Sequence, residues 1–588
     1  MIEVSKTHVS KTHGFARVRR AALEALLLGA SLAAAGSFSS ARASRLPPSP
    51  AKTKVAKSAP PATRPGEHGH GGDRVRGTDP ALASWILGET ATSTNEFRIN
   101  TYTTHRQSAS RIATDSAGNF VVVWQSDRQD GSFYGVFGQR YASGGAPLGL
   151  EFPVNTFTTS YQGRPSVACA AGGDFVAVWQ SSTQDGSEYA VIGRRYDAGG
   201  GPLGAEFQVN DYTTSSQVFP SVAADSAGNF VVVWERTGPS TSGIFGRRWS
   251  SSGAPLGAEF RLDTFTTNNP ASPMVASDGV GNFVVVWSSF HQPSSTVAVH
   301  GRRYGSTGAP TGDEFLVNTF ATSFAIAPSV SMDSSGGFVV VWQSSQEVSS
   351  YGVFGRLFDG AGAPLGTEFR VNTYTPSYQG VPSVTMDAGG GFVVVWHGDL
   401  QDGSQLGVFG QRYDGMGAPL GTEFRVNSYT TGSQGVPAVG GRPGGGFVVV
   451  WQSEGQDGSV AGIFGRRFCS DLVSVTVDVT GSTTICPTSK GGMATVTDVD
   501  GGVPAHQWGY RMLPGGPPIP IDGQTGSSYS INGANFPGPG FYYLFCFTNP
   551  ECGAPMFSND IVVIVAADMT APLVEPPRPA TLIQTICN

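Results

Sequence analysis

Four copies of a short QDGS segment carry side chains well suited to polar recognition. Their aspartates are Asp130, Asp185, Asp402 and Asp457. A second polar column lies in a separate connection of each repeat and consists of Gln107, Gln162, Gln379 and Gln434. Carboxylate and amide groups together accept and donate hydrogen bonds, which suits sugar hydroxyls better than an apolar or strongly anionic partner. The sequence therefore predicts a ligand site built from these eight residues.

Aromatic residues lie next to several of these polar positions. Tyr161 and Tyr378 immediately precede their glutamines, and Phe133 follows one QDGS segment. Flat rings of this kind can stack against a pyranose while polar groups fix its orientation, so Tyr161 and Tyr378 join the predicted ligand site. The alternative is that QDGS is only a duplicated turn, in which Asp-Gly is kept because it turns well.

Two further columns of charged residues have structural interpretations. An aspartate precedes the first hairpin of most repeats, but its loop offers one carboxylate where calcium needs six or more oxygens, so a turn-capping role is expected. These aspartates are Asp115, Asp225, Asp278, Asp333 and Asp387. A column of arginines is expected to pair across strands with Glu151, Glu206, Glu259, Glu314 and Glu423 instead of forming an anion-binding ring. The arginines are Arg140, Arg195, Arg248, Arg303, Arg412 and Arg467.

No pattern typical of an enzyme accompanies these columns. The sequence contains no nucleophile elbow, zinc-ligand spacing, phosphate-binding loop or paired catalytic carboxylates. We therefore predict no catalytic residue, no metal site and no cofactor.

A repeat of about 55 residues must position these side chains. Its clearest marker is an FVVVW stretch, FVAVW in the second repeat, that ends at Trp124, Trp179, Trp234, Trp287, Trp342, Trp396 and Trp451. Each repeat divides into four strand-length apolar stretches separated by turn residues, and the VVVW stretch is apolar on both sides of its pleat. Four-stranded sheets stacked face to face around an axis make a β-propeller, so we expect an all-β, seven-bladed propeller over residues 92–469.

The two ends of the array predict how the ring closes. Residues 96–100 form a lone fourth strand before the first repeat, whereas the last repeat lacks its fourth strand. We expect the N-terminal strand to complete the last blade and leave no open edge. Repeats six, seven, one and two then become neighbours, which gathers the four QDGS segments on one arc of a single loop face.

The repeat resembles one known from large secreted bacterial proteins. The resemblance covers residues 95–469 and rests on the motifs FVVVWQS, QDGS, GVFGQRYD and GAPLGTEFRVNTYTT. It implies an exported or surface multidomain protein, commonly with Ig-like domains beside the repeats.

A different module follows the repeats. Residues 470–568 contain about seven short predicted strands and resemble bacterial Ig-like or PKD-like β-sandwiches, on the matching residues Cys486, Trp508 and Cys552. The resemblance implies a disulfide between Cys486 and Cys552, with Cys486 to Cys546 as the alternative pairing. Residues 569–588 form a tail in which LIQTICN echoes the sequence around Cys486, as at the start of a second module.

The N-terminal region and the composition point to export. Residues 1–43 combine basic residues, an apolar run and small residues at Ala41 and Ala43, which predicts a secretory signal with Ser44 as the mature N-terminus; an uncleaved amphipathic helix is the alternative. Residues 44–91 are rich in Pro, Ala and Ser, as in a disordered linker. The net charge of −7 and the single lysine after Lys57 argue against a nucleic-acid partner. No other apolar run predicts membrane insertion after signal cleavage.

These observations predict a secreted or cell-surface, non-enzymatic binding or adhesion scaffold. Its propeller loop face would recognise a carbohydrate or protein ligand, such as a polysaccharide or a surface glycoprotein. The alternative is a secreted carbohydrate-active enzyme, a glycoside hydrolase or lyase, whose site is assembled from propeller loops.

Overall fold

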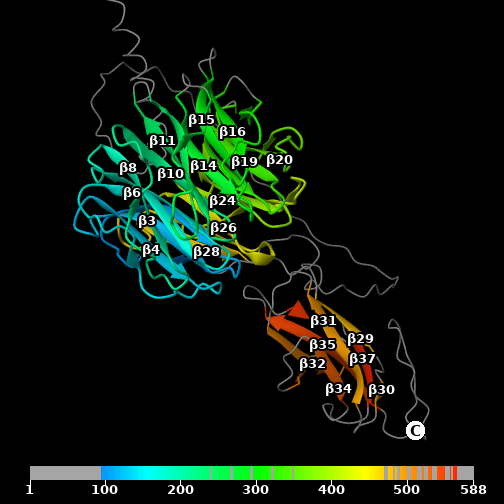
Figure 1. Cartoon of the computed structure of the whole chain (residues 1–588). Helices are drawn as coiled ribbons and strands as arrows, with labels where there is room; N and C mark the ends of the chain where they lie inside the picture. Colours follow the sequence, from blue (N-terminus) through cyan, green and yellow to red (C-terminus); the bar gives the residue numbers. More distant parts are fainter. Residues whose placement is uncertain are drawn as a thin grey trace, which may run out of the picture. The chain divides into compact units, whose positions relative to one another are not determined.

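A computed structural model describes residues 95–468 and parts of residues 475–565 (Figure 1). Short gaps in the first range fall at 239–240, 265–268, 292–295, 320–322 and 347–349. The first range forms seven four-stranded antiparallel sheets, which are the blades of an all-β propeller, as the sequence predicted. The predicted signal, the linker and the C-terminal tail lie outside the described residues.

The innermost strand of each blade contacts the innermost strand of the next, and β2 also contacts β26, so blades 1 and 7 are neighbours. In order of blades 1 to 7 the innermost strands are β2 (Gln107–Thr114), β6 (Gln162–Cys169), β10 (Ser216–Ala224), β14 (Ala271–Ser277), β18 (Ala325–Met332), β22 (Gln379–Met386) and β26 (Gln434–Gly441).

Every innermost strand contains a β-bulge at the same place, where the pairing register with the second strand shifts. The bulge residue has a positive φ between 49° and 55° in all seven blades, although none is glycine. We call these seven the bulge residues: Ala109, Arg164, Phe219, Ser272, Ala327, Val381 and Val436. A bulge bends its strand and leaves one residue outside the ladder, so its backbone N–H needs another partner.

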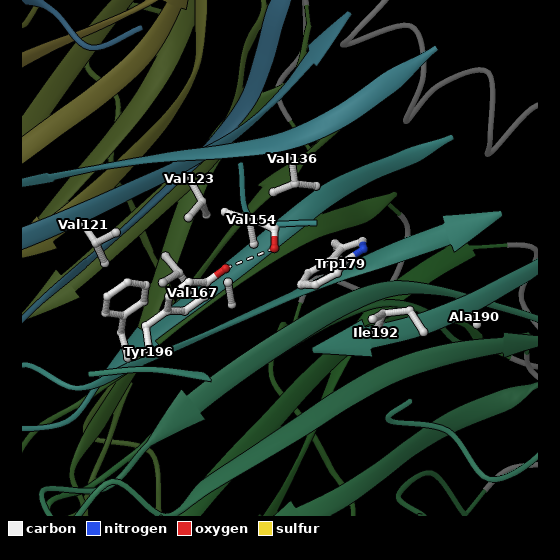
Figure 2. Packing of buried hydrophobic residues seen from close by; sticks show 11 residues of the cluster. Val121, Val123, Val136, Val154, Val167, Trp179, Ala190, Ile192 and Tyr196 are labelled. Atoms are coloured by element: carbon white, nitrogen blue, oxygen red, sulfur yellow. Dashed lines mark hydrogen bonds between the residues drawn. The ribbon is translucent and has the colours of Figure 1, made fainter. Parts of the chain in front are cut away.

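The second strands carry the FVVVW motif, and their valines and tryptophans are almost completely buried on both faces. They are β3 (Phe120–Asp127), β7 (Phe175–Ser182), β11 (Phe230–Thr237), β15 (Phe283–His291), β19 (Phe338–Ser344), β23 (Phe392–Asp399) and β27 (Phe447–Ser453). Figure 2 shows the contact between blades 1 and 2, where Val121 and Val123 pack with Trp179. In the same layer the Tyr196 hydroxyl donates a hydrogen bond to the Val154 carbonyl at 3.1 Å.

The third strands end in an aromatic residue, such as Tyr196, that stacks on the first phenylalanine of the FVVVW strand. They are β4 (Tyr134–Tyr141), β8 (Tyr189–Tyr196), β12 (Gly243–Trp249), β16 (Thr296–Tyr304), β20 (Gly352–Phe358), β24 (Leu406–Tyr413) and β28 (Gly462–Phe468). A glycine in the middle of most of them lies beneath a phenylalanine ring of the outer strand. A Cβ at Gly138 would lie 2.8 Å from Cζ of Phe152, which explains why the GVFGQR motif requires glycine there.

The outer strands are short. They are β5 (Phe152–Pro153), β9 (Phe207–Gln208), β13 (Phe260–Arg261), β17 (Phe315–Leu316), β21 (Phe369–Arg370), β25 (Pro419–Arg425) and, in blade 7, β1 (Phe97–Arg98). Strand β1 pairs antiparallel with β28, with Phe97 opposite Gly465. Asn100 accepts the Ile463 N–H at 2.6 Å, just as Asn155 accepts the Val136 N–H in blade 1.

Two further sheets follow the propeller. The first consists of β29 (Val475–Thr480), β31 (Lys490–Asp498) and β34 (Ser528–Asn532). The second consists of β30 (Thr484–Ile485), β37 (Ile561–Val565), β35 (Gly540–Asn549), β32 (Ala505–Arg511) and β33 (Ile519–Pro520), with β36 (Met556–Phe557) paired to β35. Trp508 on β32 is fully buried. The predicted disulfide partners Cys486 and Cys552 lie outside the described residues.

Helical structure in the described residues is confined to one 3₁₀ turn, Pro443–Gly445, which forms the first hairpin of blade 7. No helix in this part of the chain has the length and apolar character needed to cross a membrane.

Candidate functional site

The QDGS segments lie in the loops between the second and third strands of blades 1, 2, 6 and 7, which have six residues in blades 1, 2 and 6 and eight in blade 7. We call residues 128–133, 183–188, 400–405 and 455–460 the QDGS loops. In each loop one aspartate oxygen accepts the backbone N–H of the serine two residues later, at 2.9 to 3.1 Å. The other oxygen accepts the side-chain amide of an asparagine after the outer strand, at 3.3 to 3.5 Å. These asparagines are Asn155, Asn210, Asn427 and Asn100.

The glutamine of each QDGS loop is also bonded internally. Gln184 donates to Glu206 at 2.8 Å, and the glutamines of the other three loops make the same bond to Glu151, Glu423 and Glu96. Each of these glutamates also accepts a backbone N–H from the preceding blade, as Glu151 does from Thr101. The constant QDGS side chains therefore join the strands of one blade and connect it to the next.

This geometry gives the QDGS aspartates an internal structural role, and their contact with a ligand stays a prediction. Asp130, Asp185, Asp402 and Asp457 are half-buried, and both oxygens of each carboxylate already accept hydrogen bonds within the protein. The turn interpretation of QDGS accounts for these contacts.

The predicted glutamines are placed in the interior. Gln107, Gln162, Gln379 and Gln434 are 0% exposed. Gln107, Gln162 and Gln434 each donate to a backbone carbonyl of the loop just before the strand, as Gln162 does to Thr159 at 2.8 Å. Gln379 instead accepts the Trp396 indole N–H at 2.8 Å. Fully buried amides cannot contact a ligand, so the structure corrects this part of the predicted site.

The two predicted tyrosines pack instead of offering a flat surface. The hydroxyl of Tyr161 donates to Gln125 at 3.0 Å, and the edges of Tyr134 and Tyr189 approach its ring. Tyr378 donates in the same way to Gln343 at 2.9 Å. Burial raises the pKa of Tyr161 to about 12. Both tyrosines therefore act as interblade contacts.

Apart from the glycine of each QDGS segment, the exposed residues of the QDGS loops are the ones at their two ends. The first positions are Arg128, Thr183, Leu400 and Gly455, and the last are Phe133, Glu188, Gln405 and Val460. We call these eight the loop flanks. Phe133 is 68% exposed, Leu400 58% and Val460 57%. In three of the loops the first flank donates its N–H to the carbonyl of the last, as Arg128 does to Phe133 at 2.7 Å.

Apart from Phe133, the flanks were missed by reasoning from repeated residues, because they are the positions that do not repeat. Four loops keep QDGS, while the residue on each side changes from blade to blade. The sequence signal that could have identified the flanks is the variation in residue type on each side of a constant turn. A rigid turn that holds variable exposed side chains is how loops commonly carry recognition.

Replacing Asp402 by alanine should lower the free energy of unfolding by about 1–2 kcal/mol, because the Ser404 N–H and the buried Asn427 amide each lose an acceptor. The matched control is Leu400→Ser in the same loop, which should change it by less than about 0.5 kcal/mol because Leu400 is exposed. Urea denaturation measures both. Equal stability of the Asp402→Ala variant and the unmodified protein would contradict the internal role of the aspartate.

The arginine column binds differently from the expected cross-strand pairs. Arg140 donates to the carbonyls of Ala198 and Gly199, in the turn between the third and fourth strands of the next blade. Arg195, Arg248, Arg303 and Arg467 reach the same turn of their neighbours. The predicted pairing with Glu151, Glu206, Glu259 and Glu314 is wrong, because these glutamates accept from backbone N–H groups of the preceding blade.

The turn-capping prediction for the other aspartate column is confirmed. Asp115 accepts the N–H groups of Ala117 and Asn119 at 2.9 and 2.8 Å, and Asp225, Asp278, Asp333 and Asp387 make the same pair of bonds. In the described part of the chain, no group of three or more His, Cys, Asp or Glu side chains is arranged to hold a metal ion.

A polar residue directly after the FVVVW tryptophan satisfies the bulge of the next blade. Gln125 accepts the N–H of the bulge residue Arg164 at 3.0 Å. Gln180, Glu235 and Gln343 act in the same way on blades 3, 4 and 6. In blade 7 the acceptor is Nδ1 of His397, which lies 3.1 Å from the Val436 nitrogen. Burial lowers the pKa of His397 to about 4, so the ring stays neutral and able to accept.

Comparison with known proteins gave no family model and no curated protein that matches this chain. Solved structures that resemble it include a Dyadobacter fermentans protein of unknown function (9% identity, 64% of this chain, 98% of that chain, TM-score 0.40). Others are the polysaccharide lyase Uly1 (9% identity, 65% and 100%, TM-score 0.41) and the β-propeller domain of the trilobed protease of Pyrococcus furiosus (9% identity, 65% and 94%, TM-score 0.37). These likenesses assign no activity to this chain.

Proposed function

We propose that this chain is an exported, non-enzymatic scaffold that binds a polysaccharide or a surface glycoprotein through the loop flanks. The observation that carries the proposal is that the constant and the variable residues of the QDGS loops have different surroundings. Their constant side chains are engaged in internal hydrogen bonds, while their flanks are exposed and differ from blade to blade. Selection for a stable turn alone gives no reason to expose Phe133, Leu400 and Val460.

The position of these loops supports a ligand that makes several contacts. Blades 6, 7, 1 and 2 are consecutive in the ring, so the four loops lie on one arc of the same face. Phe133 provides an aromatic ring, while Arg128 and Gln405 add hydrogen-bond donors beside apolar Leu400 and Val460. Single contacts of this size bind weakly, and several on one rigid face strengthen binding by raising the effective concentration of the next contact. A polymer or a multivalent surface therefore suits the arc best.

The remaining parts of the chain fit the same proposal. We propose export through the N-terminal signal, and an Ig-like sandwich for the two sheets after the propeller, closed by a disulfide between Cys486 and Cys552. A buried tryptophan, Trp508, on a central strand of the larger sheet supports the sandwich. Such a module would extend the propeller as part of a surface protein.

The test measures retention of the exported chain on immobilised bacterial and plant polysaccharides and on surface glycoproteins. The flank variant carries Phe133→Ser, Leu400→Ser and Val460→Ser and should lose at least tenfold in affinity without a change in melting temperature. Its matched control carries Leu150→Ser, Leu365→Ser and Met416→Ser and should bind normally, because these residues are also exposed but lie in turns between the third and fourth strands.

Two outcomes would overturn the proposal. Equal retention of both variants would show that the flanks do not bind. Release of reducing or unsaturated sugar ends from the same polysaccharides by the unmodified chain would favour the carbohydrate-active enzyme.

A further inference from the structure

The innermost strands of the propeller are almost free of charge. Across β2, β6, β10, β14, β18, β22 and β26 there is no Asp, Glu, Lys or His. The exceptions are two arginines, Arg111 on β2 and Arg164 on β6, and these strands belong to neighbouring blades. The two positive charges are thus concentrated in one sector of the ring.

The bulge residues define where side chains reach the axis of the ring. All seven are partly exposed, whereas the residues immediately before and after each of them are buried. An innermost strand has neighbouring sheets on both faces and a paired strand on its outer edge, so water reaches its middle along the axis. Arg164 is the bulge residue of blade 2, and its guanidinium carbon lies 4.4 Å from the ring centroid of Phe219, the bulge residue of blade 3. This cation–π contact holds the guanidinium at the axis.

Arg111 replaces a structural serine. In blades 2, 3, 5 and 6 the equivalent residue is Ser166, Ser221, Ser329 or Ser383, and its hydroxyl accepts a backbone N–H from the next innermost strand. Arg111 instead donates to the Ser110 carbonyl of its own strand at 2.9 Å. Ser110 itself stands where the other blades have proline, and its buried hydroxyl has no hydrogen-bond partner among the described residues.

The two substitutions of the repeat pattern, Ser110 for proline and Arg111 for serine, have an energetic cost. The serine bond between blades is lost, a hydroxyl is buried without a partner, and two positive charges are brought close together. Burial and the nearby charge of Arg164 lower the pKa of Arg111. Within the described residues neither arginine forms an ion pair with a carboxylate. Asp115, just after β2, is occupied by the N–H groups of its own turn.

We propose that Arg111 and Arg164 form a binding site for an oxyanion at the axis of the ring, between blades 1 and 2. Two guanidinium groups offer several N–H donors in planar forks, which match the oxygens of a carboxylate, sulfate or phosphate. The oxyanion is either a small free anion or the carboxylate of an acidic saccharide. This site is separate from the loop flanks and does not depend on them.

The experiment is isothermal titration calorimetry of the full exported chain with sodium sulfate, sodium phosphate and digalacturonate, at constant ionic strength set by sodium chloride. The variants are Arg111→Ser and Arg164→Val, singly and together. Both introduce residues that other blades carry at these positions, so the propeller should fold, and its melting temperature is checked. The control is Arg425→Ser, which removes an exposed arginine from the outer strand β25, away from the loop flanks.

The unmodified chain should bind at least one of the three anions, and each substitution should raise the dissociation constant at least tenfold, whereas Arg425→Ser should leave it unchanged. Tighter binding of digalacturonate than of sulfate and phosphate would identify the acidic saccharide; the reverse order would identify a free anion. The proposal fails if the unmodified chain binds none of them or if the double variant binds as tightly as the unmodified chain. Should Arg111→Ser not fold, Arg164→Val alone decides between these results.

Discussion

Removal of residues 92–100 should lower the melting temperature of the propeller by at least about 10 °C. The deletion takes away β1, exposes the edge of β28 and leaves a cavity where Ile99, only 2% exposed, packs against the last blade. Loss of one buried isoleucine costs about 2–5 kcal/mol, and a protein of more than 150 residues loses roughly 2–4 °C per kcal/mol. Calorimetry of the truncated chain measures the change.

The size of this effect follows from the number of bonds that Glu96 and Asn100 supply. Asn100 accepts the Ile463 N–H and donates toward Asp457, while Glu96 accepts from Gln456 and from the Ser428 backbone in blade 6. The same bonds recur within the other QDGS blades, so the deletion leaves blade 7 alone without them. A chain that lacks residues 80–88 is the matched control and should melt normally. If both deletions melted alike, the N-terminal strand would have no part in closing the ring.

The propeller should lose about 3 kcal/mol of stability between pH 6.5 and pH 4 through His397 alone. Burial lowers the pKa of this histidine to about 4 in the folded protein, against about 6.5 in the unfolded chain. Below pH 6.5 the unfolded state therefore binds a proton that the folded state rejects, so stability present above pH 6.5 falls as the pH drops toward 4. Protonation would also remove the acceptor of the Val436 N–H.

Substitution His397→Gln isolates this contribution. Glutamine occupies the same position in blades 1, 2 and 5 and accepts the equivalent N–H, so the variant should fold and should be less sensitive to acid. The variant His397→Ala should be destabilised at every pH because the bulge N–H loses its acceptor. Urea denaturation from pH 4 to pH 8 measures all three proteins. Parallel stability curves for His397→Gln and the unmodified chain would show that His397 does not titrate as described.

The propeller architecture could be predicted because every repeat contains the same strands in the same order, and the same sequence motifs mark them. The apolar character of FVVVW on both sides of its pleat requires sheets on both faces, and the seven tryptophans are buried as that argument demands. The cap formed by Asp115 could also be foreseen, since its partners lie within four residues.

The direction of the loop side chains could not be predicted in the same way. The partner of Asp185 is Asn210, which lies 25 residues away, just after the outer strand of the same blade. The partner of His397 lies 39 residues away in the next blade. Such contacts depend on the stacking of sheets around the axis, which a repeat pattern does not specify. Sequence reasoning therefore chose the constant polar residues for recognition, although constancy here reflects internal bonding.

The most direct test of this account compares the thermal unfolding of two triple variants from the same three loops. One carries Asp130→Ala, Asp402→Ala and Asp457→Ala, and the other carries Phe133→Ser, Leu400→Ser and Val460→Ser. We expect the aspartate variant to melt well below the unmodified chain, because each carboxylate bonds a turn N–H and an interior asparagine. The flank variant should melt within about 1 °C of the unmodified chain. An unchanged melting temperature for the aspartate variant, or a large decrease for the flank variant, would contradict the separation of structural and recognition residues.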